Sequence, residues 1–290
     1  MIRPFFSIII PTYNRQHCLK VAVESVISQT FKHWELLVID DGSTDDTKSL
    51  ISHYTDDRVK YYYKEHAERS AARNFGIILA KGQFICFLDS DDEYLDCLLQ
   101  SHYDAIEENP DYSIFRAGTI MRKDGVMKHI TDFNKHLLTF EDLFINMNGP
   151  SSYCIKRSLL KENKFDERFY IAEDFHLLTR LIKNNDFICV KKYAFIFNFR
   201  SESVLKKNLN IPDLINKIEC YIDLLHLSFS SNQKKLIFKK FLNVLLVGLY
   251  IYFKTFDYQL YKKLYKAFKF TFCNVEILRL FFIRNNSKYS

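Results

Sequence analysis

Residues 84–92 read FICFLDSDD, and they set both the class of the structure and the place of its chemistry. The five apolar residues favour a buried strand. The four residues that follow bring three carboxylates to the end of that strand, where they repel one another unless a cation or hydrogen-bond donors offset their charge. Mg2+ and Mn2+ prefer oxygen ligands of this kind. The pattern therefore predicts either a metal site that includes Asp91 or a solvated acidic turn.

Strand-like and helix-like segments alternate before this point. The predicted strands are 6–10, 35–39, 59–63 and 84–88, and the predicted helices are 19–27, about 45–54, and 70–80. Strands that are apolar on both faces and alternate with helices are typical of an α/β fold with a doubly wound, mostly parallel sheet. In such a sheet, ligands bind beyond the carboxyl ends of the strands. Three of these strands end in polar residues, so we expect those residues to meet at one rim.

The later part of the chain changes character. Residues 94–204 mix both element types, with predicted strands 113–121 and 195–199 and predicted helices 140–146 and 171–183. From Pro212 onward the periodicity is only helical. The helices predicted there are 211–229, 233–253, 258–272 and 275–283. We therefore expect a first domain at 1–205 and a helical tail at 206–290.

Two polar clusters lie at predicted helix starts. Glu173 and Asp174 begin a helix that is otherwise apolar. A carboxylate there is either a helix-start residue favoured by the helix dipole or, when partly desolvated, a general base. Arg69 to Asn74 begin the helix at 70–80, where backbone N–H groups and arginine suit a phosphate. The residues alone leave both choices open.

Composition and cysteine usage indicate the compartment. With 48% hydrophobic and 26% charged residues, the chain is expected to be globular and not disordered. Its seven cysteines form no CxxC pair, which indicates free thiols and no structural zinc. The N-terminus shows no signal-peptide pattern, and the longest apolar run, 241–253, is shorter than the roughly 20 residues of a membrane-spanning helix. We therefore expect a cytoplasmic protein.

Five segments, taken in order, resemble the family 2 inverting glycosyltransferases of the glycosyltransferase-A fold. They are SIIIPTYNR at 7–15, WELLVIDDGSTD at 34–45, ARN and AKG at 72–74 and 80–82, FLDSDD at 87–92, and FDE and ED at 165–167 and 173–174. Each segment is weak alone, but the ordered set is specific. No GxGxxG, P-loop or GxSxG motif occurs, which argues against dinucleotide dehydrogenases, P-loop NTPases and α/β-hydrolases.

The resemblance implies a fold and a set of site residues. Residues 1–205 would be a glycosyltransferase-A catalytic domain, with its nucleotide-sugar half at about 1–95 and its acceptor half at about 96–205. The donor, with UDP as the expected nucleotide, would contact Pro11, Thr12, Tyr13, Asn14, Asp40, Asp41, Arg73, Asp89 and Ser90. In this assignment Thr12, Tyr13 and Asp40 hold the nucleobase and ribose, and Asp89 faces the ribose.

The same resemblance implies the catalytic residues and the metal. Asp91 would bind Mg2+ or Mn2+, which offsets charge on the departing nucleoside diphosphate. Asp174, with Glu173 beside it, would deprotonate the acceptor hydroxyl, and the configuration at the sugar would invert.

Some positions depart from the family pattern or match it weakly. The loop before ARN usually carries Asn and Gly, whereas His66 and Glu68 stand here, which puts the base preference in question. Ser151 and Ser152 fall where the family's acceptor loop lies, and Arg200 is a candidate diphosphate contact. The three are the weakest assignments in the set.

The tail lies outside the resemblance and is strongly basic. Residues 206–290 carry 15 Lys and Arg against 5 Asp and Glu, whereas the preceding residues carry 26 against 30. Because acceptors in glycan assembly are often lipid-linked, peripheral contact with an anionic membrane is favoured over nucleic acid. A helical bundle with solvated lysines and a dimer contact remain alternatives.

The resulting hypothesis is a metal-dependent transferase that uses a nucleotide-sugar donor and a saccharide or lipid-linked acceptor in cell-surface polysaccharide assembly. Two other functions compete with it. A non-catalytic nucleotide-sugar or glycan-binding homologue would not need the acidic motifs. A sugar nucleotidyltransferase would normally carry a glycine-rich loop after its first strand, and residues 11–15 contain no glycine.

Overall fold

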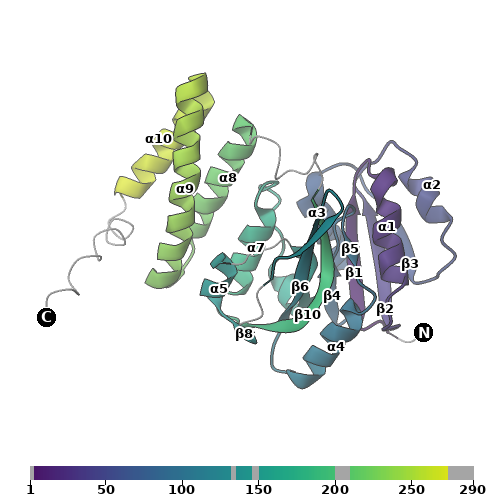
Figure 1. The fold of residues 1–290 in the computed structure, drawn as a ribbon. Helices are drawn as coiled ribbons and strands as arrows, with labels where there is room; N and C mark the ends of the chain where they lie inside the picture. Colours follow the sequence, from purple (N-terminus) through teal and green to yellow (C-terminus); the bar gives the residue numbers. More distant parts are fainter. Residues whose placement is uncertain (1–2, 132–134, 146–149, 200–209, 274–290) are drawn as a thin grey trace, which may run out of the picture. The chain divides into compact units, whose positions relative to one another are not determined.

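The computed structural model describes residues 3–131, 135–145, 150–199 and 210–273. The chain divides into two compact units, Met1–Lys206 and Lys207–Ser290. The first unit contains the sheet, and the second is helical (Figure 1).

The first unit is an α/β structure. Its strands are β1 Phe6–Thr12, β2 Trp34–Asp40, β3 Val59–Tyr63, β4 Phe84–Phe87, β5 Glu93–Tyr94, β6 Ile114–Lys123, β7 Val126–His129, β8 Leu137–Leu138, β9 Tyr153–Lys156 and β10 Phe187–Phe199. Its helices are α1 Gln16–Ile27, α2 Thr47–Ser52, α3 Glu68–Leu79, α4 Leu98–Glu108, α5 Phe140–Ile145, α6 Arg157–Glu162 and α7 Glu173–Leu181, with a 3-10 turn at Pro150–Ser152. The α/β class expected from the sequence is confirmed.

All ten strands belong to one sheet, in the order β3-β2-β1-β4-β9-β6-β10-β5, with β7 paired to β6 and β8 to β10. The strands β3, β2, β1 and β4 are parallel, as the alternating pattern predicts. The second half is mixed, because β9 runs antiparallel to both β4 and β6, while β6 and β10 are parallel. The mixed half follows the acidic turn in the chain.

Helices cover both faces of this sheet. On one face, α1 and α4 pack against β1, β2 and β6 in a large apolar core that includes Leu19, Leu99 and Phe115 (Figure 1). On the other face, α3 approaches β1 so closely that a Cβ on Gly76 would lie 2.6 Å from the Ile9 side chain. The close approach fixes the height of α3 above the sheet, and α3 carries the ARN residues.

The turn that leads into β4 is held by a buried carboxylate. Glu35 accepts hydrogen bonds from Ser7 Oγ at 2.7 Å, Lys60 Nζ at 2.8 Å and the backbone N–H of Lys81 at 2.7 Å. Burial acts to raise the pKa of Glu35, but these donors hold that pKa below its usual range. A Cβ on Gly82 would lie 2.6 Å from the backbone nitrogen of Ser7, so only glycine fits there. The AKG segment therefore aligns β4 with β1 at the sheet centre.

The second unit contains α8 Ile211–His226, α9 Ser231–Thr255 and α10 Tyr258–Cys273. Asn210 caps α8 by accepting from the N–H of Asp213, and Ser230 forms a capping box with Gln233 at the start of α9. Three of the four predicted tail helices are present, and the fourth, 275–283, lies outside the described residues. The expected Phe241–Phe253 segment is the C-terminal half of α9, which is longer than the apolar run alone suggested.

Candidate active site

The polar residues that follow β1 and β2 meet at the carboxyl ends of the strands. The N–H of Asp41 donates to the carbonyl of Thr12 at 2.9 Å. The N–H of Thr44 donates to Asn14 Oδ1 at 2.8 Å, and the N–H of Asn14 donates to Ser43 Oγ at 2.9 Å. These bonds hold Asn14 in a left-handed conformation with φ of 50°. The rim expected from the sequence is therefore formed by two interlocked loops.

Asp40 and Asp41 are both buried and play different parts in this rim. Asp40 accepts from the hydroxyl of Tyr61 at 2.6 Å and from the N–H of Ser43 at 2.8 Å. Asp41 forms an ion pair with Lys64 and accepts from the N–H of Ala67 at 3.1 Å. Asp41 thus anchors the segment that leads into α3, and Asp40 stabilises the turn that follows its own strand.

An exposed aromatic pair lies on the same rim. Tyr13 is 44% exposed, and its ring stacks on that of His66 with the ring centres 4.1 Å apart and an angle of 19°. His66 Nδ1 lies 2.8 Å from Asp41 Oδ2, which fixes the imidazole in place. Glu68, two residues later, has a φ of 71°. A residue with a side chain is strained there, in agreement with the glycine that the family pattern favours at this position.

Arg73 on α3 connects the end of β4 to the start of α7. Its side chain is 2% exposed, and it donates to Asp89 Oδ1 at 2.7 Å and to Glu173 Oε1 at 2.8 Å. Burial acts to raise the pKa of Asp89, but the charge of Arg73 outweighs it and holds that pKa below its usual range. Arg73 thus holds both Asp89, which we predicted to bind the donor, and Glu173, which we predicted to lie beside the catalytic base.

The other acidic residues after β4 face different surroundings. Asp91 forms an ion pair with Arg15, with 2.6 Å between Nη1 and Oδ2, and its side chain is 22% exposed. Asp92 is buried and accepts from the N–H of Asn198 at 2.9 Å. Ser90, which precedes them, is buried as well. The Asp91 carboxylate thus pairs with a partly exposed cation, whereas Asp89 pairs with the buried Arg73.

Asp174 is the second residue of α7, after Glu173. Ala172, which precedes the helix, has a φ of 61°. Burial, followed by the negative charge of Glu173, raises the pKa of Asp174 to about 6. Its Oδ1 accepts from the N–H of Phe175 at 2.6 Å. A carboxylate with this pKa is ionised at neutral pH and is a stronger base than an ordinary aspartate.

Residues of α3 also position the segment before α7. Asn74 donates to the carbonyl of Phe165 at 3.0 Å and accepts from the N–H of the same residue at 2.9 Å. Ser70 Oγ donates to the carbonyl of Phe169 at 2.9 Å. The ARN and FDE segments, about 90 residues apart in sequence, are therefore joined by buried hydrogen bonds.

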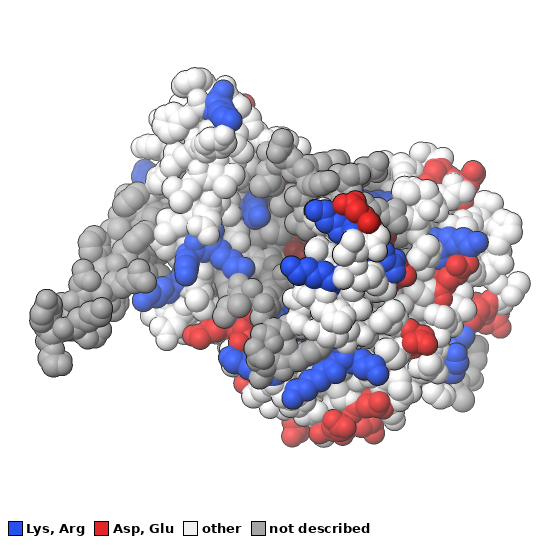
Figure 2. Space-filling model, viewed as in Figure 1, with Lys and Arg blue, Asp and Glu red and all other residues white. Residues whose placement is uncertain are grey.

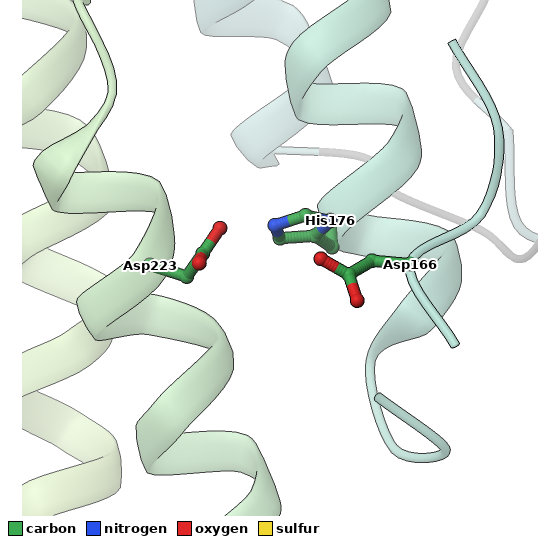
Figure 3. A group of neighbouring side chains, drawn as sticks. All are labelled: Asp166, His176 and Asp223. Carbon is green, nitrogen blue, oxygen red and sulfur yellow. The ribbon is translucent and has the colours of Figure 1, made fainter. Parts of the chain in front are cut away.

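Asp166, in the FDE motif, lies on the same segment before α7. Asp166 is held mainly by Arg168, with 2.5 Å between Nη2 and Oδ2, and the charge of His176 also lowers the pKa of Asp166. Figure 3 shows the Asp166 carboxylate next to the His176 ring on α7; it also draws Asp223, which comes from α8 of the second unit. Asp166 thus lies against the first turns of α7.

The weaker sequence assignments have different outcomes. Ser151 and Ser152 are buried, and Ser151 Oγ accepts from the N–H of Asp89 at 3.2 Å, so this turn does reach the end of β4. Arg200 lies outside the described residues. Pro11 is buried as the next-to-last residue of β1.

Sequence reasoning missed Arg15 and Asn198 as site residues. Arg15 lies within a quoted motif, but the motif does not reveal that its partner is Asp91, 76 residues away. Asn198 Nδ2 donates to the carbonyl of Asp91 at 2.9 Å across 107 residues. No local pattern marks either contact, because the first depends on the packing of the start of α1 beside the acidic turn and the second on the packing of β10 there.

Comparisons with known proteins identify the family of the chain. The model of a family described as Glycosyl transferase family 2 matches residues 7–169. A Campylobacter jejuni protein, named GalNAc(5)-diNAcBac-PP-undecaprenol beta-1,3-glucosyltransferase, is 31% identical over 210 residues, which are 69% of this chain and 67% of that protein.

Two solved structures share the fold. The structure of S. aureus TarS 1-349 in complex with UDP-GlcNAc superposes with a TM-score of 0.73 at 20% identity, and covers 90% of this chain and 79% of that one. The mannosyltransferase PcManGT from Pyrobaculum calidifontis, in complex with GDP-Man and Mn2+, has a TM-score of 0.62 at 14% identity, and covers 97% of this chain and 79% of that one. The resemblance predicted from the five motifs is confirmed, and the chain belongs to glycosyl transferase family 2.

Proposed function

We propose that this protein transfers a sugar, with inversion, from a nucleotide-sugar donor to a hydroxyl of a saccharide or lipid-linked glycan during assembly of a cell-surface polysaccharide. The observation that carries the proposal is the buried Arg73, which holds Asp89 and Glu173 together and so brings Asp174 to the donor side of the sheet. The Campylobacter jejuni relative is named for a glycan on diphosphoundecaprenol, which supports a lipid-linked acceptor.

The donor nucleotide occupies the rim in this proposal. The exposed ring of Tyr13 offers a flat surface for the nucleobase, and Asp40 ends β2 in register with Thr12, the residue before Tyr13. Asp89 faces the ribose, since its side chain is 34% exposed although one oxygen is held by Arg73. UDP is the nucleotide we favour, and the TarS structure with UDP-GlcNAc supports it.

Mg2+ or Mn2+ fits at Asp91. The carboxylate already accommodates a positive group, the guanidinium of Arg15, which is 39% exposed and free to move away. Asp89 is committed to Arg73 and Asp92 to the backbone of Asn198, so neither competes for this role. When bound, the ion would neutralise charge on the leaving diphosphate.

Asp174 is the general base of the proposal. Its carboxylate takes the proton of the acceptor hydroxyl as the acceptor oxygen bonds to the anomeric carbon and the bond from that carbon to the diphosphate breaks. The nucleoside diphosphate leaves from the opposite face, so the configuration inverts. Glu173, held by Arg73 at 2.8 Å, fixes the first turn of α7 and thereby the position of Asp174.

Membrane contact through the second unit is part of the proposal. Helix α9 is 25 residues long and contains an 18-residue window with a mean hydropathy of 1.7, so that by length and composition it could cross a bilayer. Of that window, 33% is buried. One side of α9 contributes Phe241 and Leu245 to the core of the unit, while Tyr250 and Phe253 are exposed. In the view of Figure 2, blue Lys and Arg side chains lie among broad white surfaces on these helices. We favour peripheral attachment to an anionic leaflet on the cytoplasmic side.

A thermal-shift panel tests the donor site. UDP, GDP, CMP and dTDP are each added with Mn2+ or with EDTA to the wild type and to Asp91→Ala. At 100 times Kd a ligand adds about 2.7 kcal/mol, which is a rise in Tm of about 5 °C or more for a protein of this size. We expect a metal-dependent rise with UDP that Asp91→Ala loses. If none of the four nucleotides raises Tm, the donor assignment is wrong.

A further inference from the structure

Arg116 is an arginine buried in the sheet of the first unit. It lies on β6, in register with Tyr153 on β9 and with Cys189 on β10. Its side chain is 1% exposed, and its guanidinium carbon is 5.8 Å from the centre of the Tyr153 ring. A charged group this deeply buried normally has a counter-charge or a full set of hydrogen bonds.

Arg116 lacks such partners. Its Nε and Nη2 have no hydrogen-bond acceptor within the described ranges, and neither the Tyr153 hydroxyl nor Ser152 Oγ has a partner there. Arg73 is the instructive comparison, because it is equally buried and forms ion pairs with two carboxylates. No ion pair of Arg116 occurs among the residues that the structure describes.

These polar groups adjoin a turn that reaches the end of β4. Tyr153 is the first residue of β9 and directly follows Ser151 and Ser152 in the chain. Ser151 Oγ accepts a hydrogen bond from the N–H of Asp89. Burial raises the pKa of Tyr153, with the charge of Arg116 opposing this and that of Asp174 adding to it. The Tyr153 ring therefore lies beside Arg116, at the end of a turn that contacts Asp89.

The unpaired nitrogens define the kind of ligand that fits. Nε and Nη2 form one edge of the planar guanidinium, and two parallel N–H groups on that edge match two oxygens of a phosphate or a carboxylate. The hydroxyls of Tyr153 and Ser152 can each donate one more hydrogen bond. The cluster thus offers donors for an oxyanion and no negative charge of its own.

We propose that Arg116, Tyr153 and Ser152 form a subsite for an oxyanion of the acceptor, a phosphate ester or a sugar carboxylate, next to the turn that contacts Asp89. The subsite rests on the proposed function, since it assigns a charge to the acceptor of the same reaction. Because the guanidinium is covered in this structure, the acceptor anion reaches it after neighbouring side chains move, and small anions are the appropriate probes.

Thermal unfolding with sulfate tests the subsite in the full chain. Sodium sulfate is titrated against NaCl at equal ionic strength, with UDP and Mg2+ held at saturation so that the donor site is filled. The variants are Arg116→Met, Tyr153→Phe and the control Arg58→Met, which removes an arginine that pairs with Asp56 instead. Comparison between variants removes the general stabilisation that sulfate gives any protein.

The expected result is a saturable rise in Tm with sulfate, about 5 °C or more at 100 times Kd, in the wild type and in Arg58→Met. Arg116→Met should lose this rise, and Tyr153→Phe should shift it to at least about threefold higher sulfate, which is the loss of one hydrogen bond. Without sulfate, Arg116→Met should unfold at the wild-type temperature or above, since an apolar side chain replaces an unpaired buried charge.

Three results would overturn the inference. The first is an equal sulfate response in Arg116→Met, and the second is a fall of several degrees in its Tm without sulfate, which would mean that Arg116 has a structural partner. The third is no wild-type response to sulfate although UDP still raises Tm. Failure of UDP to raise Tm counts against the donor site instead.

If Arg116→Met does not fold, an unchanged sulfate response in Tyr153→Phe overturns the inference. Dimethyl phosphate and glucuronate, titrated in the same way, separate the two sources of the anion.

Discussion

At the scale of single residues, the site contrasts two kinds of carboxylate. Asp89 is held ionised by Arg73, whereas burial and the nearby Glu173 raise the pKa of Asp174 to about 6. Asp174 therefore destabilises the folded state when it is charged, since its folded pKa lies above its unfolded value near 4. This is the kind of strain expected of a catalytic group.

The first prediction concerns Asp174 and pH. Because the base must be ionised, kcat/KM should rise with pH through about 6 and level off above it. Asp174→Asn should lower transfer by about 10²- to 10⁴-fold. It should also unfold at the wild-type temperature or higher at pH 7, because asparagine cannot charge. Transfer by Asp174→Asn within a few-fold of the wild-type rate would contradict the assignment of the base.

The second prediction concerns Arg15. Its ion pair with Asp91 competes with any cation at that carboxylate, so Arg15→Ala should bind Mn2+ more tightly in the absence of nucleotide. A partly exposed pair is worth up to about 1 kcal/mol, which corresponds to about fivefold in Kd. Calorimetric titration with Mn2+ measures this, with Arg58→Ala as the control for lost charge. Unchanged or weaker Mn2+ binding by Arg15→Ala would show that Arg15 does not occupy the metal position.

At the scale of helices and strands, α3 organises the site. Its backbone is held against β1 at Gly76, its Arg73 joins β4 to α7, and its Asn74 and Ser70 bind the segment before α7. The start of this helix is strained, since Glu68 has a φ of 71°. Stability and site geometry therefore depend on the same helix.

The third prediction uses this strain. Glu68→Gly should stabilise the protein by about 1 kcal/mol, because glycine adopts a positive φ without the steric cost of a side chain. The expected rise in Tm is about 2–4 °C. The control Glu24→Gly, on the exposed face of α1, should have the opposite sign, since glycine in a helix interior costs about 1 kcal/mol. A fall in Tm for Glu68→Gly would show that the side chain of Glu68 contributes more than the strain removes.

The sequence predicted the first half of the sheet closely and the second half poorly. The strands β1 to β4 are apolar runs that end at polar turns, so periodicity reveals them. By contrast, β5 and β8 have two residues each and β9 has four, and they pair with residues far away in the chain. Only residues 195–199 of β10 were predicted, because Lys191 and Lys192 interrupt its pattern at a register shift.

The site was predictable where a motif carries it and not where packing does. Asp89, Asp91 and Asp174 stand in motifs whose order along the chain is informative. The pairing of Arg15 with Asp91, and the lack of a partner for Arg116 Nε and Nη2 among the described residues, depend on distant segments brought together by the fold. Sequence periodicity contains no information on such contacts.

At the scale of the whole molecule, the chain consists of two compact units of different chemistry. The first has the residues proposed for catalysis, and the second has exposed Tyr and Phe side chains among lysines on α9 and α10. Such a surface suits the boundary between lipid headgroups and acyl chains.

The fourth prediction concerns membrane binding. The full chain should sediment with vesicles that contain phosphatidylglycerol and not with pure phosphatidylcholine, and 0.5 M NaCl should release it, because screening weakens the lysine contribution. The double variant Tyr250→Ser and Phe253→Ser should bind at least about tenfold more weakly, whereas Val126→Ser, an exposed apolar residue of the first unit, should bind normally. Resistance to both salt and alkaline carbonate would show that α9 inserts, and no sedimentation would show that the tail has only a packing role.

The bridge formed by Arg73 has a consequence for how such an enzyme can change. A substitution at Asp89 that suits a new donor leaves half of a buried guanidinium unpaired, and the loss is felt at Glu173 and hence at the turn that presents Asp174. Variation in donor choice and variation in acceptor chemistry are therefore coupled through one side chain. Natural or laboratory evolution of new specificity should therefore leave Arg73, Asp89 and Glu173 intact. Substitutions should accumulate instead in the loops around Tyr13 and His66, where a change alters the fit of the nucleobase without disturbing the turn that presents Asp174.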